Sequence, residues 1–100
     1  MEYKYRITVF TPTYNRAYVI PKLYKSLCSQ SFKNFEWLVV DDGSSDETES
    51  LFSKWISNSD FEIRYYKTKN GGKHRAINKG MEVANGEIFF TMDSDDELTT

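Results

Sequence analysis

Strand-like and helix-like segments alternate along the whole chain, and this alternation constrains the fold more than any other feature. Four short runs rich in β-branched or aromatic residues are predicted to be strands, at residues 5–11, 36–41, 61–67 and 87–92. Three helices are predicted between them: one at about residues 19–31, one that follows the DDGSS turn, and one at about residues 73–84. Apolar residues recur at helical spacing in each. A βαβαβαβ chain of this kind predicts an α/β fold, with right-handed crossovers and helices on both faces of a mainly parallel sheet.

Particular residues set the predicted limits of these elements. Pro12 is predicted to end the first strand, since proline cannot donate to a strand ladder. Asp46 with Glu49 three residues later predicts a capping box at the start of the second helix, and Asn85 with Gly86 predicts the end of the third. The apolar stripes expected to be buried are Val19, Ile20, Leu23, Tyr24, Leu27 and Cys28, then Leu51, Phe52, Trp55 and Ile56, then Ile77, Met81 and Ala84.

Four such strands form a doubly wound, Rossmann-like sheet most simply in the order 3-2-1-4. The reversal of strand order between the first and the fourth strand creates a crevice at their carboxyl ends, where ligands bind in open α/β sheets. Two polar motifs that follow strand ends, Pro12-Thr13-Tyr14 and Asp93-Ser94-Asp95, are expected to flank this crevice, and the Asp41-Asp42 turn is expected one strand away. We therefore expect the functional site at this edge of the sheet.

Length, charge and cysteine content restrict the class of protein. The 100 residues suffice for one unit, residues 1–100, and their formal net charge of -2 argues against general nucleic-acid binding by a basic surface. Cys28 is the single cysteine, which excludes an intrachain disulfide and a cysteine-based zinc site and is typical of a reducing compartment. No apolar stretch approaches the ~20 residues of a membrane span. We expect a cytoplasmic protein whose full-length form is peripheral to the membrane.

The charged residues are segregated along the chain. Residues 34–53 carry acidic and no basic side chains, and residues 63–81 carry basic and no acidic ones. A carboxylate cluster at one wall and cations at another favour a metal-bound diphosphate, because carboxylates hold Mg²⁺ or Mn²⁺ and the cations neutralise the remaining phosphate charge. Lys67, Lys69 and Lys79 are better explained as a solvated face.

Two aspartates near the end of the chain are candidates for the metal. Asp93 and Asp95 are separated by one residue after a predicted strand, so a persistent pleat would point both carboxylates to the same side. The alternative is a helix N-cap, with acidic residues at the positive end of the helix dipole. Lys73 follows two glycines at a predicted helix N-terminus, which is a place suited to a phosphate.

Three residues of the Pro12-Thr13-Tyr14 motif and the Asp41-Asp42 turn are candidates for a nucleoside site. Tyr14 either stacks on a nucleobase or covers the sheet edge. Asp42 is suited to accept a hydrogen bond from a base N–H, whereas Asp41 is suited to brace the DGSS turn.

Five segments together resemble the N-terminal, nucleotide-binding half of family 2 glycosyltransferases, which have the GT-A fold. The segments are ITVFTPTYNR, LCSQSF, FEWLVVDDGSSDET, NGGKHRAINKG and ANGEIFFTMDSDD, in the family's order and over nearly the whole chain. The resemblance implies metal-dependent, inverting transfer of a sugar from a nucleotide diphosphate sugar, usually UDP-linked, with Mn²⁺ or Mg²⁺ as cofactor. It also implies a saccharide or glycolipid acceptor and a place in polysaccharide or glycoconjugate synthesis.

The resemblance implies roles for single residues as well. Pro12, Thr13 and Tyr14 would border the nucleoside. Asp42 would contact the base, and Asp41 would support the loop that carries it. Lys73 would contact the base or a phosphate, Asp93 would face the ribose and the metal, and Asp95 would hold the ion. The chain departs from the family where Ile77 replaces an arginine, and the family's general base is expected beyond Thr100. We therefore expect a truncated, donor-binding part of a GT-A domain, inactive by itself and prone to self-association through uncovered apolar faces.

Three other interpretations fit parts of the sequence. A phosphorylation receiver domain shares an acidic pair like Asp41-Asp42 and a strand that ends in an aspartate, but it places the pair after its first strand. A nucleotidyltransferase also uses an acidic pair and a metal, but it carries a glycine-rich basic loop where this chain has TPTYNR. A non-catalytic nucleotide-binding module is the third alternative.

Overall fold

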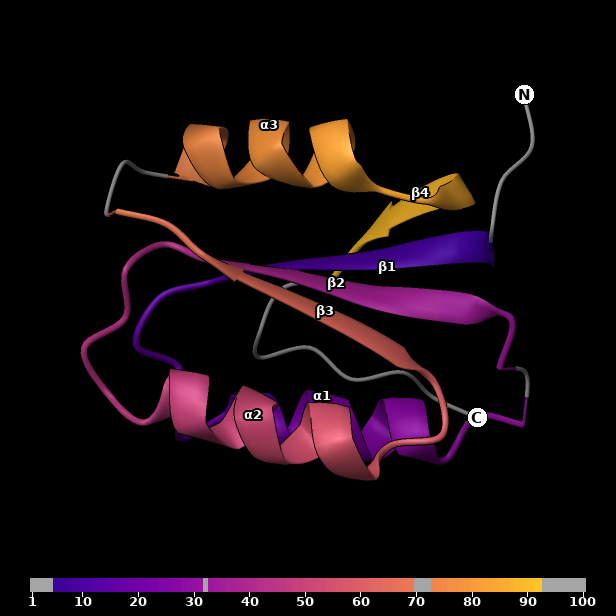
Figure 1. Cartoon of the computed structure of the whole chain (residues 1–100), viewed down its shortest axis with the longest axis horizontal. Helices are drawn as coiled ribbons and strands as arrows, with labels where there is room; N and C mark the ends of the chain where they lie inside the picture. The colour runs from indigo at the N-terminus through magenta and orange to yellow at the C-terminus, as the bar shows by residue number, and fades with distance from the viewer. Residues whose placement is uncertain (1–4, 32, 70–72, 93–100) are drawn as a thin grey trace.

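The computed structural model describes residues 5–31, 33–69 and 73–92, in which four strands alternate with three helices. The elements are β1 (Tyr5–Thr13), α1 (Ile20–Cys28), β2 (Phe35–Asp41), α2 (Thr48–Asn58), β3 (Glu62–Lys67), α3 (Lys73–Val83) and β4 (Gly86–Thr91). The strands form one parallel sheet in the order β3-β2-β1-β4, which confirms the predicted topology. Helices α1 and α2 cover one face of the sheet, and α3 covers the other (Figure 1).

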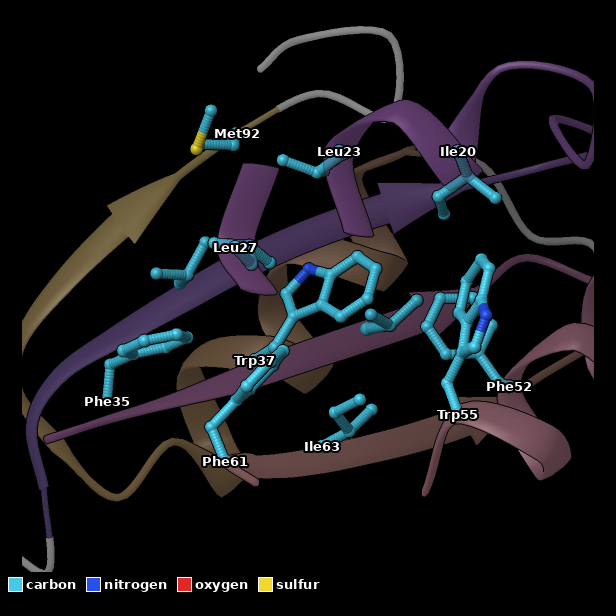
Figure 2. Close-up of a cluster of buried hydrophobic side chains, with 12 residues drawn as sticks. Ile20, Leu23, Leu27, Phe35, Trp37, Phe52, Trp55, Phe61, Ile63 and Met92 are labelled. Atoms are coloured by element: carbon cyan, nitrogen blue, oxygen red, sulfur yellow. The ribbon is translucent and has the colours of Figure 1, made fainter. Parts of the chain in front are cut away.

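The larger core lies between the sheet and helices α1 and α2 (Figure 2). Strand β2 runs through it, and all seven residues of this strand are buried, as expected for a parallel strand covered on both faces. Trp37 packs against Phe52 at 5.1 Å between ring centroids, and Tyr24 stacks on Trp55 at 4.2 Å. These contacts hold α1 and α2 against the sheet, and with them the loops that lead into both helices.

Helix α3 packs on the opposite face, over a smaller core that includes Phe10. The helix approaches the sheet closely at Gly80, where a Cβ atom would lie 2.2 Å from Phe10 Cε1. A Cβ atom at Gly86 would lie 2.4 Å from the Thr8 hydroxyl oxygen. Gly86 is the first residue of β4 rather than the predicted end of a helix. Glycine suits this position because β4 approaches β1 too closely for a side chain.

A fully buried carboxylate lies on the α3 side of the sheet. Glu36 pairs with Arg64 at 2.8 Å between Oε1 and Nη1. It also accepts hydrogen bonds from the Thr8 hydroxyl at 2.6 Å and from the Asn85 amide at 2.5 Å. Arg64 in turn donates to the Val83 carbonyl at 2.7 Å. Because a buried charge is stable only when it is paired and hydrogen-bonded, this network ties three strands to the connection between α3 and β4.

Strand β1 continues past Pro12 to Thr13, so the prediction that proline ends this strand is wrong. The Phe10 carbonyl accepts a hydrogen bond from Met92 on the β4 side, whereas the Thr13 carbonyl accepts one from Asp42 on the β2 side. Because successive residues of a strand face opposite neighbours, the Pro12 nitrogen faces the β4 side, beyond the end of that strand. The missing N–H of Pro12 therefore costs the pairing of β1 with β2 nothing.

The helices are shorter than predicted, since α1 ends at Cys28 and α3 ends at Val83. The predicted stripes are also narrower: Cys28, Ile56 and Met81 are exposed. Each of these residues directly follows a buried one and therefore points about 100° away from it around the helix. In the described ranges, no helix has the length and apolar character needed to cross a bilayer.

Strand β4 forms one edge of the sheet and leaves apolar side chains accessible. Ile88 and Phe90 are 44% and 49% exposed. With Val9, Leu27 and Phe35 they are among the residues that line an apolar pocket of about 260 Å³. Self-association through such a face stays a prediction.

Candidate functional site

The loops that leave β1 and β2 lie side by side at the carboxyl end of the sheet, the end at which α3 begins (Figure 1). Thr13, the last residue of β1, is the register partner of Asp41, and its carbonyl accepts a 2.9 Å hydrogen bond from the Asp42 amide. On the other side of β1, the Met92 amide donates to the Phe10 carbonyl at 2.8 Å. The predicted motifs that follow β1 and β2 are therefore adjacent, and Met92, which precedes the Asp93-Ser94-Asp95 motif in the sequence, lies beside β1.

The Asp41 carboxylate is buried and braces the turn after β2. Its Oδ1 atom accepts hydrogen bonds from the Ser44 amide at 2.9 Å and hydroxyl at 2.5 Å, and its Oδ2 atom accepts one from the Tyr65 hydroxyl. Gly43 adopts a φ of 82° in this turn, a conformation that residues with side chains rarely adopt. Burial and the contact with Asp41 raise the pKa of Tyr65, so its hydroxyl stays a donor. These contacts favour a supporting role for Asp41.

The candidate nucleoside residues differ in accessibility. Pro12 is half-buried within β1, Tyr14 is 45% exposed, and Asp42 is 9% exposed. Thr13 is 4% exposed, and its hydroxyl oxygen has no hydrogen-bond partner among the residues that the structure describes. A buried hydroxyl without a partner costs about 1–3 kcal/mol, so Thr13 is an unfavourable feature of the free protein at this end of the sheet.

Two side chains tie the loop after β1 to the loop after β2. Asn15 has a φ of 51°, and its Oδ1 atom accepts hydrogen bonds from the Ser45 amide at 2.8 Å and the Asp46 amide at 3.2 Å. Asp46, in the loop after β2, contacts the loop after β1: its Oδ2 atom accepts a 3.1 Å hydrogen bond from the Ala17 amide. The predicted capping box is wrong, because the Asp46 amide is bonded to Asn15 and Glu49 forms an ion pair with β3 instead.

Sequence reasoning did not single out Asn15. One local signal was available: asparagine adopts the left-handed backbone conformation more readily than most residues, and this one directly follows Tyr14. Its partners Ser45 and Asp46 lie 30 and 31 residues away, so they are visible only once β1 and β2 are paired.

The candidate phosphate and metal residues are placed only in part. Helix α3 begins at Lys73, at the same end of the sheet, but the Lys73 side chain and residues Asp93 and Asp95 lie outside the described part. Within the described part, no group of three or more His, Cys, Asp or Glu residues could hold a metal ion. The carboxylates that follow Met92 in the sequence are the kind of oxygen donors that Mg²⁺ and Mn²⁺ prefer.

Comparison with known proteins identifies the family. Residues 8–100 match the model of glycosyl transferase family 2. The chain belongs to this family. It is 37% identical to a GalNAc(5)-diNAcBac-PP-undecaprenol beta-1,3-glucosyltransferase of Campylobacter jejuni, over 93% of this chain and 30% of that protein. It is 34% identical to the poly(ribitol-phosphate) beta-N-acetylglucosaminyltransferase TarS of Staphylococcus aureus, over 93% of this chain and 17% of that protein. The chain thus spans less than a third of the length of either relative.

Solved structures of glycosyltransferases have the same fold. S. aureus TarS in complex with UDP-GlcNAc matches with a TM-score of 0.79 and 34% identity, over 92% of this chain and 27% of that one. The mannosyltransferase PcManGT of Pyrobaculum calidifontis, in complex with GDP-Man and Mn²⁺, matches with a TM-score of 0.87 and 31% identity, over 98% of this chain and 30% of that one. The fold is the GT-A fold, and the receiver and nucleotidyltransferase interpretations are set aside.

Proposed function

We propose that this chain supplies the donor-binding part of an inverting glycosyltransferase, which moves a sugar from a nucleotide diphosphate sugar to an acceptor hydroxyl. One observation carries the proposal: Thr13, with a buried hydroxyl that no described residue satisfies, lies next to Tyr14 and bonds through its carbonyl to Asp42. In open α/β sheets ligands bind at the carboxyl ends of the strands. In a family of glycosyltransferases, the donor nucleotide is the ligand that fits this place.

Each residue of the proposed nucleoside site has its own task. Tyr14, 45% exposed, offers an aromatic face on which a base stacks. The Asp42 carboxylate accepts a hydrogen bond from a base N–H, and the Thr13 hydroxyl bonds to a polar atom of the nucleoside. Pro12 shapes the wall behind them as part of β1, and Asp41 holds the turn that carries Asp42.

UDP is the nucleotide that we propose. Uracil carries one N–H between two carbonyl groups, and Asp42 is suited to accept from it. The TarS structure holds UDP-GlcNAc, which supports this choice, whereas the PcManGT structure holds GDP-Man. The base preference is therefore the part of the proposal that a direct comparison of nucleotides decides.

We further propose that a divalent cation, Mn²⁺ or Mg²⁺, is held by Asp95 and Asp93, with Asp93 also facing the ribose. The Mn²⁺ in the PcManGT structure supports a divalent cation in this fold. When bound, such an ion offsets the negative charge that develops on the departing diphosphate. Lys73, at the N-terminus of α3, adds positive charge for the phosphates. No residue of this chain is assigned the role of general base.

The acceptor is proposed to be a saccharide or a glycolipid. The name of one relative supports this class, since that protein acts on an undecaprenol-linked saccharide, whereas the other relative acts on poly(ribitol-phosphate), a polymer of alditol phosphates.

Titration calorimetry with UDP, GDP and ADP, each with and without Mn²⁺, tests the proposal. UDP is expected to bind most tightly and to gain affinity with Mn²⁺. Asp95→Ala should remove this gain, and Asp42→Ala should weaken uridine binding without metal. Asp60→Ala is the control, because Asp60 forms its 3.6 Å ion pair with Lys33, on the segment that leads into β2. If none of the three nucleotides binds, the proposal is refuted. If Asp95→Ala binds UDP in the presence of Mn²⁺ within about twofold of wild type, the metal assignment is refuted.

A further inference from the structure

Asn15 joins the loop after β1 to the loop after β2 through both its backbone and its side chain. Its amide donates to the Ser44 hydroxyl oxygen at 2.7 Å. Its Oδ1 atom accepts from the Ser45 and Asp46 amides at 2.8 and 3.2 Å. The Ser44 hydroxyl donates in turn to Asp41 at 2.5 Å. A continuous chain of hydrogen bonds therefore runs from Asn15 to the buried carboxylate that braces the second loop.

This connection lies beside the proposed nucleoside residues on both loops. Asn15 directly follows Tyr14, and Ser44 stands two residues after Asp42. Tyr14 and Asp42 belong to different loops, so the contacts between the loops set the spacing of the two residues. A rigid spacing lowers the entropy cost of binding a flat, rigid ligand between them.

We propose that Asn15 is a positioning residue, which holds Tyr14 and Asp42 at the spacing that a nucleoside requires. The inference rests on the proposed function and adds a residue to it. Two properties of asparagine fit this role. It tolerates the φ of 51° at this position, and its carboxamide oxygen accepts from two successive amides.

These two properties are separated by two substitutions. Asn15→Gly keeps the backbone conformation but removes the acceptor oxygen, whereas Asn15→Asp keeps both the conformation and an acceptor. Asn34→Gly is the matched control, because the Asn34 side chain also accepts from a backbone amide, that of Arg6, but at the opposite end of the sheet. Any loss that is specific to Asn15→Gly therefore reports the connection between the loops.

The experiment measures the affinity for uridine, and the affinity for UDP with and without Mn²⁺, for wild type and the three variants. Asn15→Gly is expected to bind uridine about tenfold more weakly, equivalent to about 1.4 kcal/mol. Asn15→Asp and Asn34→Gly should stay within about twofold of wild type. The factor by which Mn²⁺ improves UDP binding should be equal in all four proteins, because it reports the diphosphate and not the nucleoside. A general loss of folded protein would lower the binding stoichiometry instead.

Each outcome decides the inference. Uridine affinity of Asn15→Gly within about twofold of wild type overturns it and leaves the proposed function standing. Equal weakening in Asn15→Asp and Asn15→Gly also overturns it, because the acceptor oxygen would then not matter. Absence of nucleotide binding by the wild type overturns both. If Asn15→Gly does not fold, Ser44→Ala removes the hydroxyl link with no change of φ at residue 15. Unchanged uridine affinity of Ser44→Ala would then overturn the link through the Asn15 amide, and weaker binding would support it.

Discussion

Replacement of Thr13 by valine is expected to stabilise the protein and weaken nucleotide binding at the same time. The Thr13 side chain is buried at the end of β1, and its hydroxyl has no partner among the described residues. Valine has nearly the same shape and lacks the polar group. The substitution therefore removes an unfavourable feature of the free protein and a favourable contact of the proposed complex.

The two effects can be estimated separately. A buried hydroxyl without a partner costs about 1–3 kcal/mol, and valine suits a strand, so Thr13→Val should raise the free energy of unfolding by about 1 kcal/mol. The hydrogen bond that the nucleoside would make contributes about 0.5–1.5 kcal/mol net, so UDP affinity should fall by about two- to twelvefold.

Thr11→Val provides a control of opposite sign in the same strand. The Thr11 hydroxyl oxygen accepts a 2.9 Å hydrogen bond from Trp37 Nε1, and both side chains are fully buried. Valine at residue 11 leaves that indole N–H unsatisfied and should lower the free energy of unfolding by about 1–3 kcal/mol. Urea unfolding followed by tryptophan fluorescence measures stability, and calorimetry measures UDP binding. If Thr13→Val destabilised the protein as Thr11→Val does, or bound UDP as wild type does, the reasoning about the Thr13 hydroxyl would be refuted.

Three further predictions concern the scaffold. Glu36→Ala should lower the free energy of unfolding by about 3–5 kcal/mol because it leaves Arg64 without its buried partner. Glu87→Ala, in an exposed pair with Arg6, should change it by less than about 1 kcal/mol, and equal urea midpoints would contradict this contrast. Gly80→Ala should cost about 1–3 kcal/mol, since its Cβ would lie 2.2 Å from the Phe10 ring; an unchanged midpoint would show that α3 shifts freely. Burial opposes ionisation of Asp46, but hydrogen bonds from Thr48 and Ala17 outweigh it and lower the pKa below the ordinary 3.8. The contribution of Asp46 to the free energy of unfolding should thus be complete above pH 3.8 and be lost as the pH falls through the lowered pKa. Unfolding curves of Asp46→Asn, measured at decreasing pH, should lack this loss.

The topology could be predicted because it depends on local patterns. The apolar run before Asp41 indicates a strand covered on both faces, and the alternation of strands and helices leaves few arrangements of a parallel sheet. Pro12 and Gly86 were misjudged for a shared reason. Their local preferences, to end a strand and to end a helix, depend on which neighbouring strand each residue faces. That information arises only when β1 pairs with β2 and β4.

The site was predictable in its position but not in its internal connections. The strand order follows from topology, so Pro12-Thr13-Tyr14 and Asp93-Ser94-Asp95 were expected at the crevice and the Asp41-Asp42 turn one strand away. The different surroundings of Asp41 and Asp42 follow from contacts that no local pattern encodes, such as the Tyr65 hydroxyl on Asp41. Asn15 escaped notice because its acceptor oxygen serves amides of a loop some 30 residues away.

A crystal structure of the protein with UDP and Mn²⁺ tests the central claim most directly. The account predicts that the uridine lies between Tyr14 and Asp42 at the carboxyl ends of β1 and β2, with the Thr13 hydroxyl hydrogen-bonded to the nucleoside. UDP bound elsewhere on the protein, or bound there with the Thr13 hydroxyl still without a partner, would contradict it.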